Sequence, residues 1–261
     1  MEGSPLRVAL FAAGPVGLEV ARFLGEAGDP PALLVLDEGD PGEMREAIAA
    51  AAGLPASRVL TSAEAETEEG VARMRAAVPD LGVLAWWPRL VREPVLSLPR
   101  LGLLNFHPSL LPYNRGKHYN FWALVEGAPF GVTLHWVDAG VDTGPIAFQA
   151  PLAVTWHDTG ETLYHRAREA IVRLFRDSWP RIRAGDIPRL PQDPAVATSH
   201  RAAELEPASR VDLDGTYRGR ELLNLLRART FPPHPGAWFQ DDDGVRWQVR
   251  VQIERVSPDG D

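Results

Sequence analysis

Residues 6–24 read Leu-Arg-Val-Ala-Leu-Phe-Ala-Ala-Gly-Pro-Val-Gly-Leu-Glu-Val-Ala-Arg-Phe-Leu. The run at 6–11 is short and mostly apolar, as in a strand buried inside a sheet, and Gly14 and Gly17 bracket a turn after it. From Val16 onward the apolar residues recur at helical spacing. A buried strand, a tight turn and an amphipathic helix in this order predict an α/β fold.

The same alternation of short apolar runs and helical stretches continues along the chain. Because parallel strands joined by helices are buried on both faces, this alternation predicts a parallel, Rossmann-like sheet covered by helices. Further strands of this sheet are expected at residues 32–36, 59–60, 81–87 and 101–106, with helices at 41–52 and 63–77. Beyond them we expect a helix at 119–126, paired strands at 131–137 and 145–149, and a long helix from 159 to 182.

The last part of the chain has a different pattern. Residues 187–199 are rich in proline and polar residues and predict a connector. A short amphipathic helix at 220–229 follows, and then two strands at 237–240 and 245–253, with Asp-Asp-Asp-Gly between them as a hairpin turn. We therefore expect a catalytic domain at residues 1–190 and a small C-terminal unit at 200–261.

Composition excludes several classes of function. The 261 residues carry 35 acidic and 27 basic side chains, a net charge of −8, which disfavours a nucleic-acid partner. There is no cysteine, so disulfides, thiolate metal sites and cysteine nucleophiles are excluded. The first residues lack a signal-peptide pattern, and no apolar run is long enough to span a bilayer. We expect a cytoplasmic protein without a membrane partner.

The first turn raises the alternative of a dinucleotide site, because Asp37 stands at the end of the second predicted strand. The spacing G-x-G-x-x-G is missing, however, and Pro15 removes a backbone N–H that a phosphate cradle needs. Gly14 and Gly17 are therefore interpreted as a tight turn.

The strongest candidate for chemistry starts at Asn105 and reads Asn-Phe-His-Pro-Ser-Leu-Leu-Pro, followed later by Asp142-Thr-Gly. Asn105 closes a predicted strand, and ligands of open α/β sheets bind at the carboxyl ends of strands. Its amide can donate to an oxygen that gains negative charge, which is worth on the order of 3 kcal/mol. His107 can move a proton near neutral pH, and Asp142 can orient its ring. The alternative is purely structural, with polar residues capping a turn.

Two other chemistries fit the sequence poorly. Ser109 does not stand in a G-x-S-x-G elbow, so its hydroxyl is expected to bond to the backbone of the loop. The seven histidines show neither H-x-x-x-H nor H-E-x-x-H spacing, so no metal is expected.

Residues 105–144 resemble the folate-dependent formyltransferases, which share an Asn, a His two residues later in a His-Pro-Ser-Leu-Leu-Pro loop, and an Asp in an Asp-x-Gly setting. The resemblance implies catalytic roles for Asn105, His107 and Asp142 and 10-formyltetrahydrofolate as formyl donor. The stretches 113–122 and 126–133, and 227–238 in the tail, are most similar to the nucleotide-sugar N-formyltransferases.

The same resemblance implies where the two substrates bind. The pterin is expected between the loop near residues 85–90 and the loop 138–142, although core packing is an equal alternative for the two tryptophans there. The cofactor-binding candidates are Trp86, Trp87, Leu90, Val137, Asp138 and Gly140. The acceptor-binding candidates are Tyr113, Asn114, Arg115, Lys117, His118 and Tyr119.

For the acceptor, the resemblance implies the amine of a nucleotide-linked amino dideoxy sugar, such as one carried by dTDP, in polysaccharide biosynthesis. The tail is too short for a separate tRNA-binding domain, and by analogy it is expected to form a homodimer or cover the active site. A purine-pathway ribonucleotide, as in glycinamide ribonucleotide formyl transfer, is the second enzyme hypothesis. A folate- or nucleotide-binding sensor is the non-enzyme hypothesis, which the complete Asn, His and Asp set disfavours.

Overall fold

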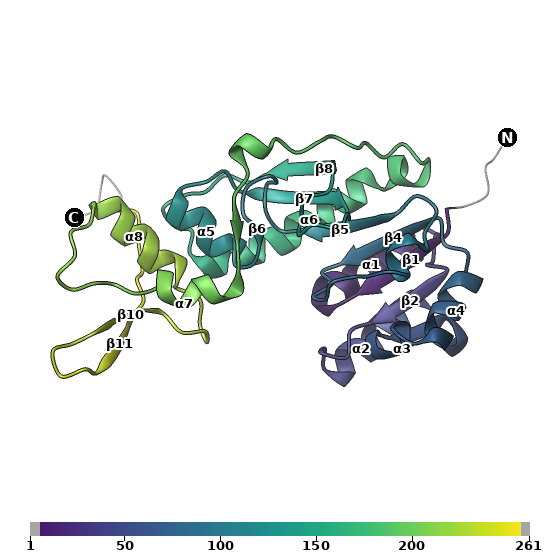
Figure 1. The fold of residues 1–261 in the computed structure, drawn as a ribbon, viewed down its shortest axis with the longest axis horizontal. Helices are drawn as coiled ribbons and strands as arrows, with labels where there is room; N and C mark the ends of the chain where they lie inside the picture. Colours follow the sequence, from purple (N-terminus) through teal and green to yellow (C-terminus); the bar gives the residue numbers. More distant parts are fainter. Residues whose placement is uncertain (1–5, 257–261) are drawn as a thin grey trace. The chain divides into compact units, whose positions relative to one another are not determined.

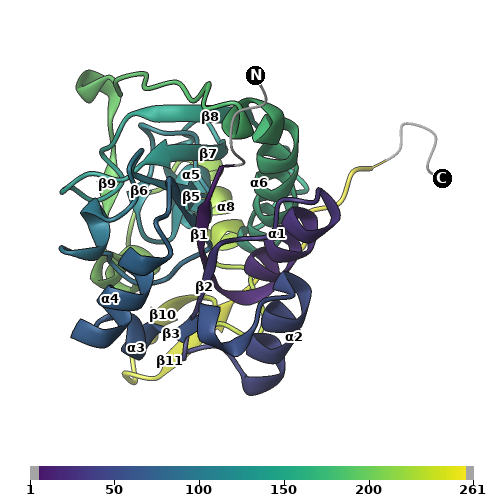
Figure 2. The ribbon, with the colours of Figure 1, turned by 90° about the vertical axis from the view of Figure 1, so that its right-hand side faces the viewer.

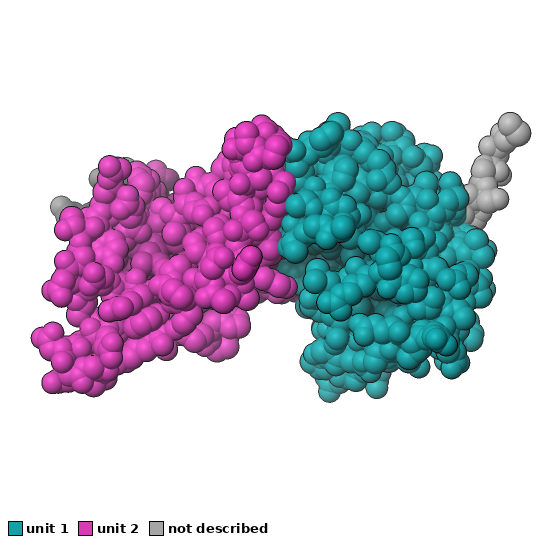
Figure 3. All heavy atoms as spheres, in the orientation of Figure 1, with its two compact units in different colours: residues 1–107, 133–149, 169–192 teal, residues 108–132, 150–168, 193–261 magenta. Residues whose placement is uncertain are grey.

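A computed structural model of the chain describes residues 6–256. The chain divides into two compact units, coloured separately in Figure 3. Unit 1 comprises residues 1–107, 133–149 and 169–192, and unit 2 comprises residues 108–132, 150–168 and 193–261.

A mainly parallel seven-stranded sheet runs through the chain in the order β3-β2-β1-β4-β5-β7-β8 (Figure 1). The first five strands pair in parallel, and β7 is antiparallel to β5. The predicted Rossmann-like α/β architecture is therefore confirmed. The strands are β1 (Val8–Ala12), β2 (Leu33–Leu36), β3 (Val59–Thr61), β4 (Leu81–Ala85), β5 (Leu103–His107), β7 (Gly131–Trp136) and β8 (Ile146–Pro151).

Helices cover both faces of this sheet, as Figure 2 shows. On one face α1 (Gly14–Glu26) packs against α2 (Gly42–Ala52), and the ring of Phe23 in α1 contacts Phe175 of α6 (Gly160–Arg183) at a centroid distance of 6.0 Å. On the other face, Phe11 and Val35 share a core cluster with Met74 of α4 (Glu68–Ala76). Alternate side chains of each strand thus feed two separate apolar layers, which accounts for the nearly continuous apolar strands.

The single helix expected at residues 63–77 is two helices, and that prediction is wrong at its middle. α3 (Ser62–Ala65) begins with a capping box, in which Thr61 and Glu64 bond each other's backbone N–H groups. The side chain of Thr67 then accepts from the N–H of Gly70 at 3.0 Å and begins α4. A threonine that caps a new helix competes with continuing the old one.

Unit 2 is built from short elements around α5 (Tyr119–Glu126), which packs against α8 (Gly219–Ala228). The expected tail hairpin is present as β10 (Ala237–Gln240) and β11 (Arg246–Val249), which are antiparallel. A parallel pair, β6 (Arg115–Gly116) with β9 (Ser199–His200), was not expected. The remaining short helices of the chain are η1 (Ala56–Arg58), η2 (Val95–Ser97), η3 (Pro194–Val196), η4 (Ala202–Glu204) and α7 (Leu205–Ala208). Within residues 6–256, every helix is too short or too polar to cross a bilayer.

Asp158, just before α6, is a buried hub of unit 2. Its carboxylate accepts from the backbone N–H of Thr155 at 2.7 Å and from Arg166 at 2.6 Å. Burial alone would raise the pKa of Asp158, but these hydrogen bonds outweigh it, so the pKa lies below the ordinary 3.8. The carboxylate is therefore ionised at neutral pH, and its charge-assisted bonds stabilise the folded unit.

We expect Asp158→Ala to lower the free energy of unfolding by roughly 2–4 kcal/mol, because Arg166 and the Thr155 N–H lose a buried partner. Since the folded pKa is depressed, this stabilisation is full above the unfolded pKa and is lost as the pH falls through the folded one. Urea unfolding at pH 7 and at about pH 3 measures it. Asp177→Ala, on an exposed face of α6, is the control, and equal unfolding energies for both variants at pH 7 would contradict the expectation.

Candidate functional site

Pairing of β5 with β7 places four polar side chains on one face of the sheet within unit 1. Asn105 lies opposite His135, and His107 lies opposite Thr133. Because side chains alternate along a strand, all four point to the same side, and the apolar residues between them point to the other. On that other side Phe106 packs against α6. The polar face is therefore a consequence of strand register over an apolar layer.

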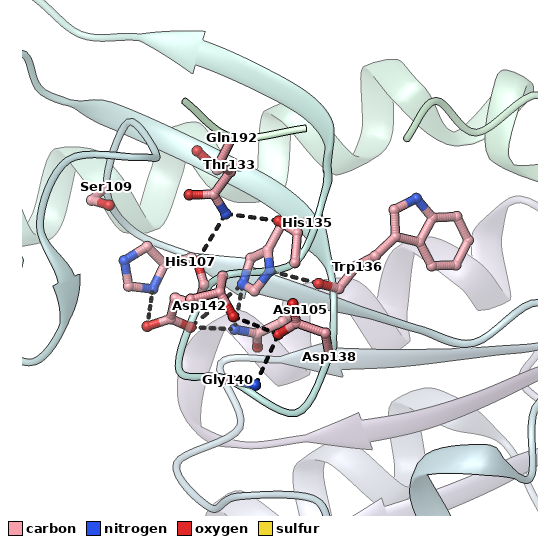
Figure 4. A network of polar contacts seen from close by, with 12 residues as sticks. Asn105, His107, Ser109, Thr133, His135, Trp136, Asp138, Gly140, Asp142 and Gln192 are labelled. Atoms are coloured by element: carbon pink, nitrogen blue, oxygen red, sulfur yellow. Dashed lines mark hydrogen bonds and ion pairs between the residues drawn. The ribbon is translucent and has the colours of Figure 1, made fainter. Parts of the chain in front are cut away.

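The carboxylate of Asp142 lies between the two histidines of this face (Figure 4). Its Oδ2 is 3.4 Å from Nδ1 of His107, and its Oδ1 is 3.5 Å from both Nε2 of His135 and Nδ2 of Asn105. His107 is 4% exposed and the side chain of Asp142 is 14% exposed, so water screens these contacts little. The structure thus brings the three predicted catalytic residues together around one carboxylate.

His135 belongs to the same cluster, although the sequence reasoning did not select it. Its Nδ1 is 2.9 Å from the carbonyl oxygen of Trp136, which can only accept, so Nδ1 carries a proton. In the neutral ring Nε2 is then an acceptor, and the Nδ2 of Asn105 donates to it at 3.1 Å. His135 therefore fixes which way the Asn105 amide points.

A signal for His135 was present in the sequence. Residues 133–136 read Thr-Leu-His-Trp, with the same polar and apolar alternation as Asn-Phe-His at 105–107. If the two segments are antiparallel neighbours, their polar residues must share one face. Only the assumed pairing of 131–137 with 145–149, and not with 101–106, concealed this.

We expect His135→Leu to lower kcat by about 10- to 100-fold, because the Asn105 amide loses the acceptor that orients it, at a cost of roughly 1–3 kcal/mol. The KM for the formyl donor should change little. Steady-state kinetics of purified variants measure both constants. His157→Leu, at an exposed position, should behave like the wild type, and a wild-type kcat in His135→Leu would remove His135 from the positioning network.

The backbone around Asp142 is held in an unusual conformation. Asp142 has φ 54°, a left-handed value that costs a non-glycine residue of order 1–3 kcal/mol unless the surroundings enforce it. The side-chain amide of Gln192 donates to the carbonyl oxygens of Asp142 at 2.8 Å and of Gly144 at 2.7 Å. Asp138 closes the start of the loop by accepting from the N–H of Gly140 at 3.0 Å. The two predicted cofactor residues Asp138 and Gly140 therefore shape the loop that presents Asp142.

The other cofactor-binding candidates lie near the end of β4 and β7. Trp86 has φ 61°, and the ring of Trp87 meets Phe11 edge-on at a centroid distance of 5.5 Å. Trp87 and Val137 pack on the core cluster, whereas Leu90 is 67% exposed. Core packing thus accounts for Trp87 and Val137, and pterin contact stays a prediction for the whole set.

The predicted acceptor loop lies in unit 2, where the connector holds it. As expected, the Ser109 hydroxyl bonds to the backbone, donating to the carbonyl oxygen of Tyr113 at 2.7 Å. Asn114 is fully buried, and its N–H donates to the hydroxyl of Thr198 at 2.8 Å. Arg115 then pairs in β6 with β9, so the connector predicted at 187–199 supplies a strand that shapes this loop.

The end of the same loop leads into α5. Lys117 is exposed, and its N–H donates to the carbonyl oxygen of His200 at 3.0 Å. His118 has φ 60° at the N-cap of α5. The ring of Tyr119 stacks on Phe130 at 6.5 Å, and burial raises its pKa well above 10.0. Contact with an acceptor stays a prediction for all six residues of the loop.

The first turn of the chain is occupied by a carboxylate of the protein itself. The N–H of Gly14, at the start of α1, donates to Oδ2 of Asp40 at 2.7 Å. Asp37, at the end of β2, pairs with Arg89 at 2.6 Å. Both contacts suit a structural turn, in which a side chain of the protein takes the place of a bound anion at the helix N-terminus. Within the described residues 6–256, no three His, Cys or acidic side chains are grouped so as to hold a metal ion.

Comparison with known families gives two matches. The family described as Formyl transferase matches residues 26–177, and the N-formyltransferase dimerization C-terminal domain matches residues 204–255. A methionyl-tRNA formyltransferase of Methylacidiphilum infernorum (isolate V4) is 38% identical over 161 residues, which is 61% of this chain and 49% of that protein. The chain spans about half the length of the curated relatives it matches.

Solved structures share the fold over nearly the whole chain. A sugar N-formyltransferase from Shewanella sp FDAARGOS_354 superposes with a TM-score of 0.78 at 17% identity, covering 97% of this chain and 99% of that one. An N-formyltransferase from Helicobacter canadensis, solved with folinic acid and dTDP-3-aminofucose, gives 0.69 at 17% identity over 91% and 85%. The resemblance drawn from residues 105–144 is confirmed by the family match.

Proposed function

The chain belongs to the formyl transferase family, and from this premise we propose that it moves a formyl group from 10-formyltetrahydrofolate to the amine of a nucleotide-linked amino dideoxy sugar, such as one carried by dTDP. The observation that carries the proposal is the convergence of Asn105 and His107 on the carboxylate of Asp142. Both side chains carry N–H groups that suit a formyl oxygen, so the residues present fit this donor.

The amine attacks the formyl carbon, and the carbonyl oxygen becomes a tetrahedral oxyanion. The Nδ1 of His107 faces Asp142, which leaves Nε2 to donate a hydrogen bond to that oxyanion. The contact from Asn105 to Asp142 is long at 3.5 Å, so its amide hydrogen can turn to the same oxygen. These donors stabilise the transition state more than the planar formyl group, which is the condition for catalysis.

Protons balance within the same cluster. The bond between the formyl carbon and N10 breaks, N10 gains a proton, and the attacking amine loses one. Protonated His107 supplies a proton toward the leaving nitrogen, and the carboxylate of Asp142 stabilises the imidazolium and receives the amine proton directly or through water. No covalent enzyme intermediate is required, in agreement with a Ser109 that is committed to the loop backbone.

The nucleotide-sugar acceptor is supported by the C-terminal part of the chain. Residues 204–255 match the N-formyltransferase dimerization domain, and the Helicobacter canadensis neighbour was solved with a dTDP-linked amino sugar. The methionyl-tRNA formyltransferase relatives match only 61–66% of the chain, and the net charge of −8 disfavours a polyanionic acceptor. We also propose that residues 200–261 form a homodimer interface beside a catalytic domain at 1–190, in a cytoplasmic enzyme.

The test is incubation of the purified chain with 10-formyltetrahydrofolate and a panel of amines. The panel contains dTDP-linked 3-amino and 4-amino dideoxy sugars, glycinamide ribonucleotide and methionyl-tRNA. We expect the gain of one formyl group, read by mass, on a nucleotide-linked sugar, with release of tetrahydrofolate. Formylation of methionyl-tRNA or glycinamide ribonucleotide alone would replace the acceptor assignment, and no transfer to any amine would contradict the reaction itself.

A further inference from the structure

Unit 2 contains a pocket of about 630 Å³. It is formed by the beginning of α5, the first turns of α6 and the segment that follows α8. Its volume lies in the range of sites that enclose ligands of the size of a nucleotide. The lining residues are His118, Tyr119, Asn120, Phe121, Tyr164, His165, Leu205, Glu206, Ala228, Arg229, Phe231, His234 and Pro235.

Arg229 places a buried positive charge in this pocket. The residue is only 8% exposed, and its Nε has no hydrogen-bond partner within the described part of the chain. Its one ion pair, to Glu206, is long at 3.9 Å. Burial lowers the pKa of Arg229, and Glu206 only partly offsets this. A buried guanidinium with an unused N–H is costly unless an anion completes its shell.

Cations outnumber anions around this guanidinium. Glu206 is shared with Arg246, which makes a close ion pair with it, and Arg250 adds a further positive charge near Arg229. Burial lowers the pKa of His118, and the neighbouring charges of Arg229, Lys117 and His234 lower it further. The net potential of the pocket is therefore positive, which favours a ligand with more than one negative charge.

An aromatic wall stands beside the charge. The rings of Tyr164 and Phe231 are 5.3 Å apart, and Phe231 meets His234 edge-on at 4.8 Å. His165 lies against both Tyr164 and Phe231. Such a wall offers faces and edges for a planar ring, and stacking of a base on aromatic side chains is worth about 1–3 kcal/mol per base.

We propose that this pocket binds a nucleoside diphosphate, with its phosphates at Arg229 and its base against Tyr164 and Phe231. Neither feature alone asks for such a ligand: inorganic phosphate would leave the aromatic wall uncovered, and a neutral ring would leave Arg229 unpaired. The nucleotide can be the handle of the formyl acceptor, an arm that rests on the proposed function, or a free nucleotide that acts as an effector.

Binding is tested by titration calorimetry of the full chain with dTDP, UDP, thymidine and inorganic diphosphate. We expect the nucleoside diphosphates to bind more tightly than either fragment, and Arg229→Gln to weaken them by tenfold or more. Phe231→Leu should weaken dTDP and thymidine but not inorganic diphosphate, and it guards against the case in which Arg229→Gln fails to fold. Arg218→Gln, with a side chain that is 88% exposed, is the matched control and should bind like the wild type.

The proposal is overturned if dTDP and UDP do not bind at millimolar concentration, or if both pocket variants bind them as the wild type does. The source of the nucleotide follows from kinetics. For an acceptor handle, Arg229→Gln raises the KM of the amino sugar but not that of the formyl donor, and free dTDP competes with the acceptor. For an effector, Arg229→Gln loses dTDP binding with an unchanged KM. Because calorimetry needs no turnover, a chain that formylates nothing but binds dTDP contradicts the proposed function and leaves the pocket assignment intact.

Discussion

Asp142→Asn is expected to lower kcat by roughly 10³- to 10⁴-fold while leaving the fold intact. The substitution keeps the size of the side chain and removes the negative charge that His107 faces at 3.4 Å and His135 at 3.5 Å. An uncharged amide can neither stabilise the imidazolium of His107 nor receive the proton of the attacking amine. Formation of tetrahydrofolate, followed in single turnovers with saturating substrates, isolates the chemical step.

The matched control is Asp186→Asn. Asp186 is exposed and pairs with Arg181 at 2.7 Å, so its loss removes a surface ion pair that stabilises little. Circular dichroism of both variants establishes that the comparison is between folded proteins. If Asp142→Asn turned over within tenfold of the wild type, the carboxylate would have no part in proton transfer.

His107→Ala is expected to cost roughly 10³-fold in kcat, because the oxyanion loses a donor and the leaving nitrogen loses its proton source. The more informative measurement is the double variant His107→Ala/Asp142→Asn. Groups that act as one unit are strongly non-additive, so the double variant should be within about tenfold of the slower single variant. Independent roles would instead multiply the two losses.

The pH profile supplies a second check on this unit. In the wild type the activity depends on the ionisation of the coupled cluster around Asp142, and removal of the imidazole should abolish the limb that it contributes. His234→Gln, which removes an exposed imidazole in unit 2, should retain that limb. A profile of His107→Ala that matches the wild type in shape would show that another group carries the proton.

Much of the fold was predictable because burial writes itself into the sequence. Strands such as β1 and β4 lie in the middle of a parallel sheet, are covered on both faces, and appear as uninterrupted apolar runs. The helix at 119–126 was predicted with the bounds it has, since Gly127 ends it with φ 63°. By contrast, β6 and β9 each have two residues and pair across a long sequence separation, so no local periodicity could indicate them.

The candidate site was predictable in its residues but not in its support. Asn105, His107 and Asp142 stand out because polar side chains follow an apolar strand and match a family motif. His135 and Gln192 do not stand out, because each acts through a contact that exists only after folding. The Gln192 amide reaches the carbonyl of Asp142 from 50 residues further along the chain.

That tether from Gln192 limits how this protein can be divided. The family match ends at residue 177, and a fragment cut there would retain Asn105, His107, His135 and Asp142. It would lose the amide that holds the backbone of Asp142 at φ 54° through the carbonyls of Asp142 and Gly144. Shortened enzymes, domain chimeras and split reporters made from this scaffold should therefore place their junctions beyond residue 192, since every catalytic side chain can be present without the loop conformation that aims the carboxylate.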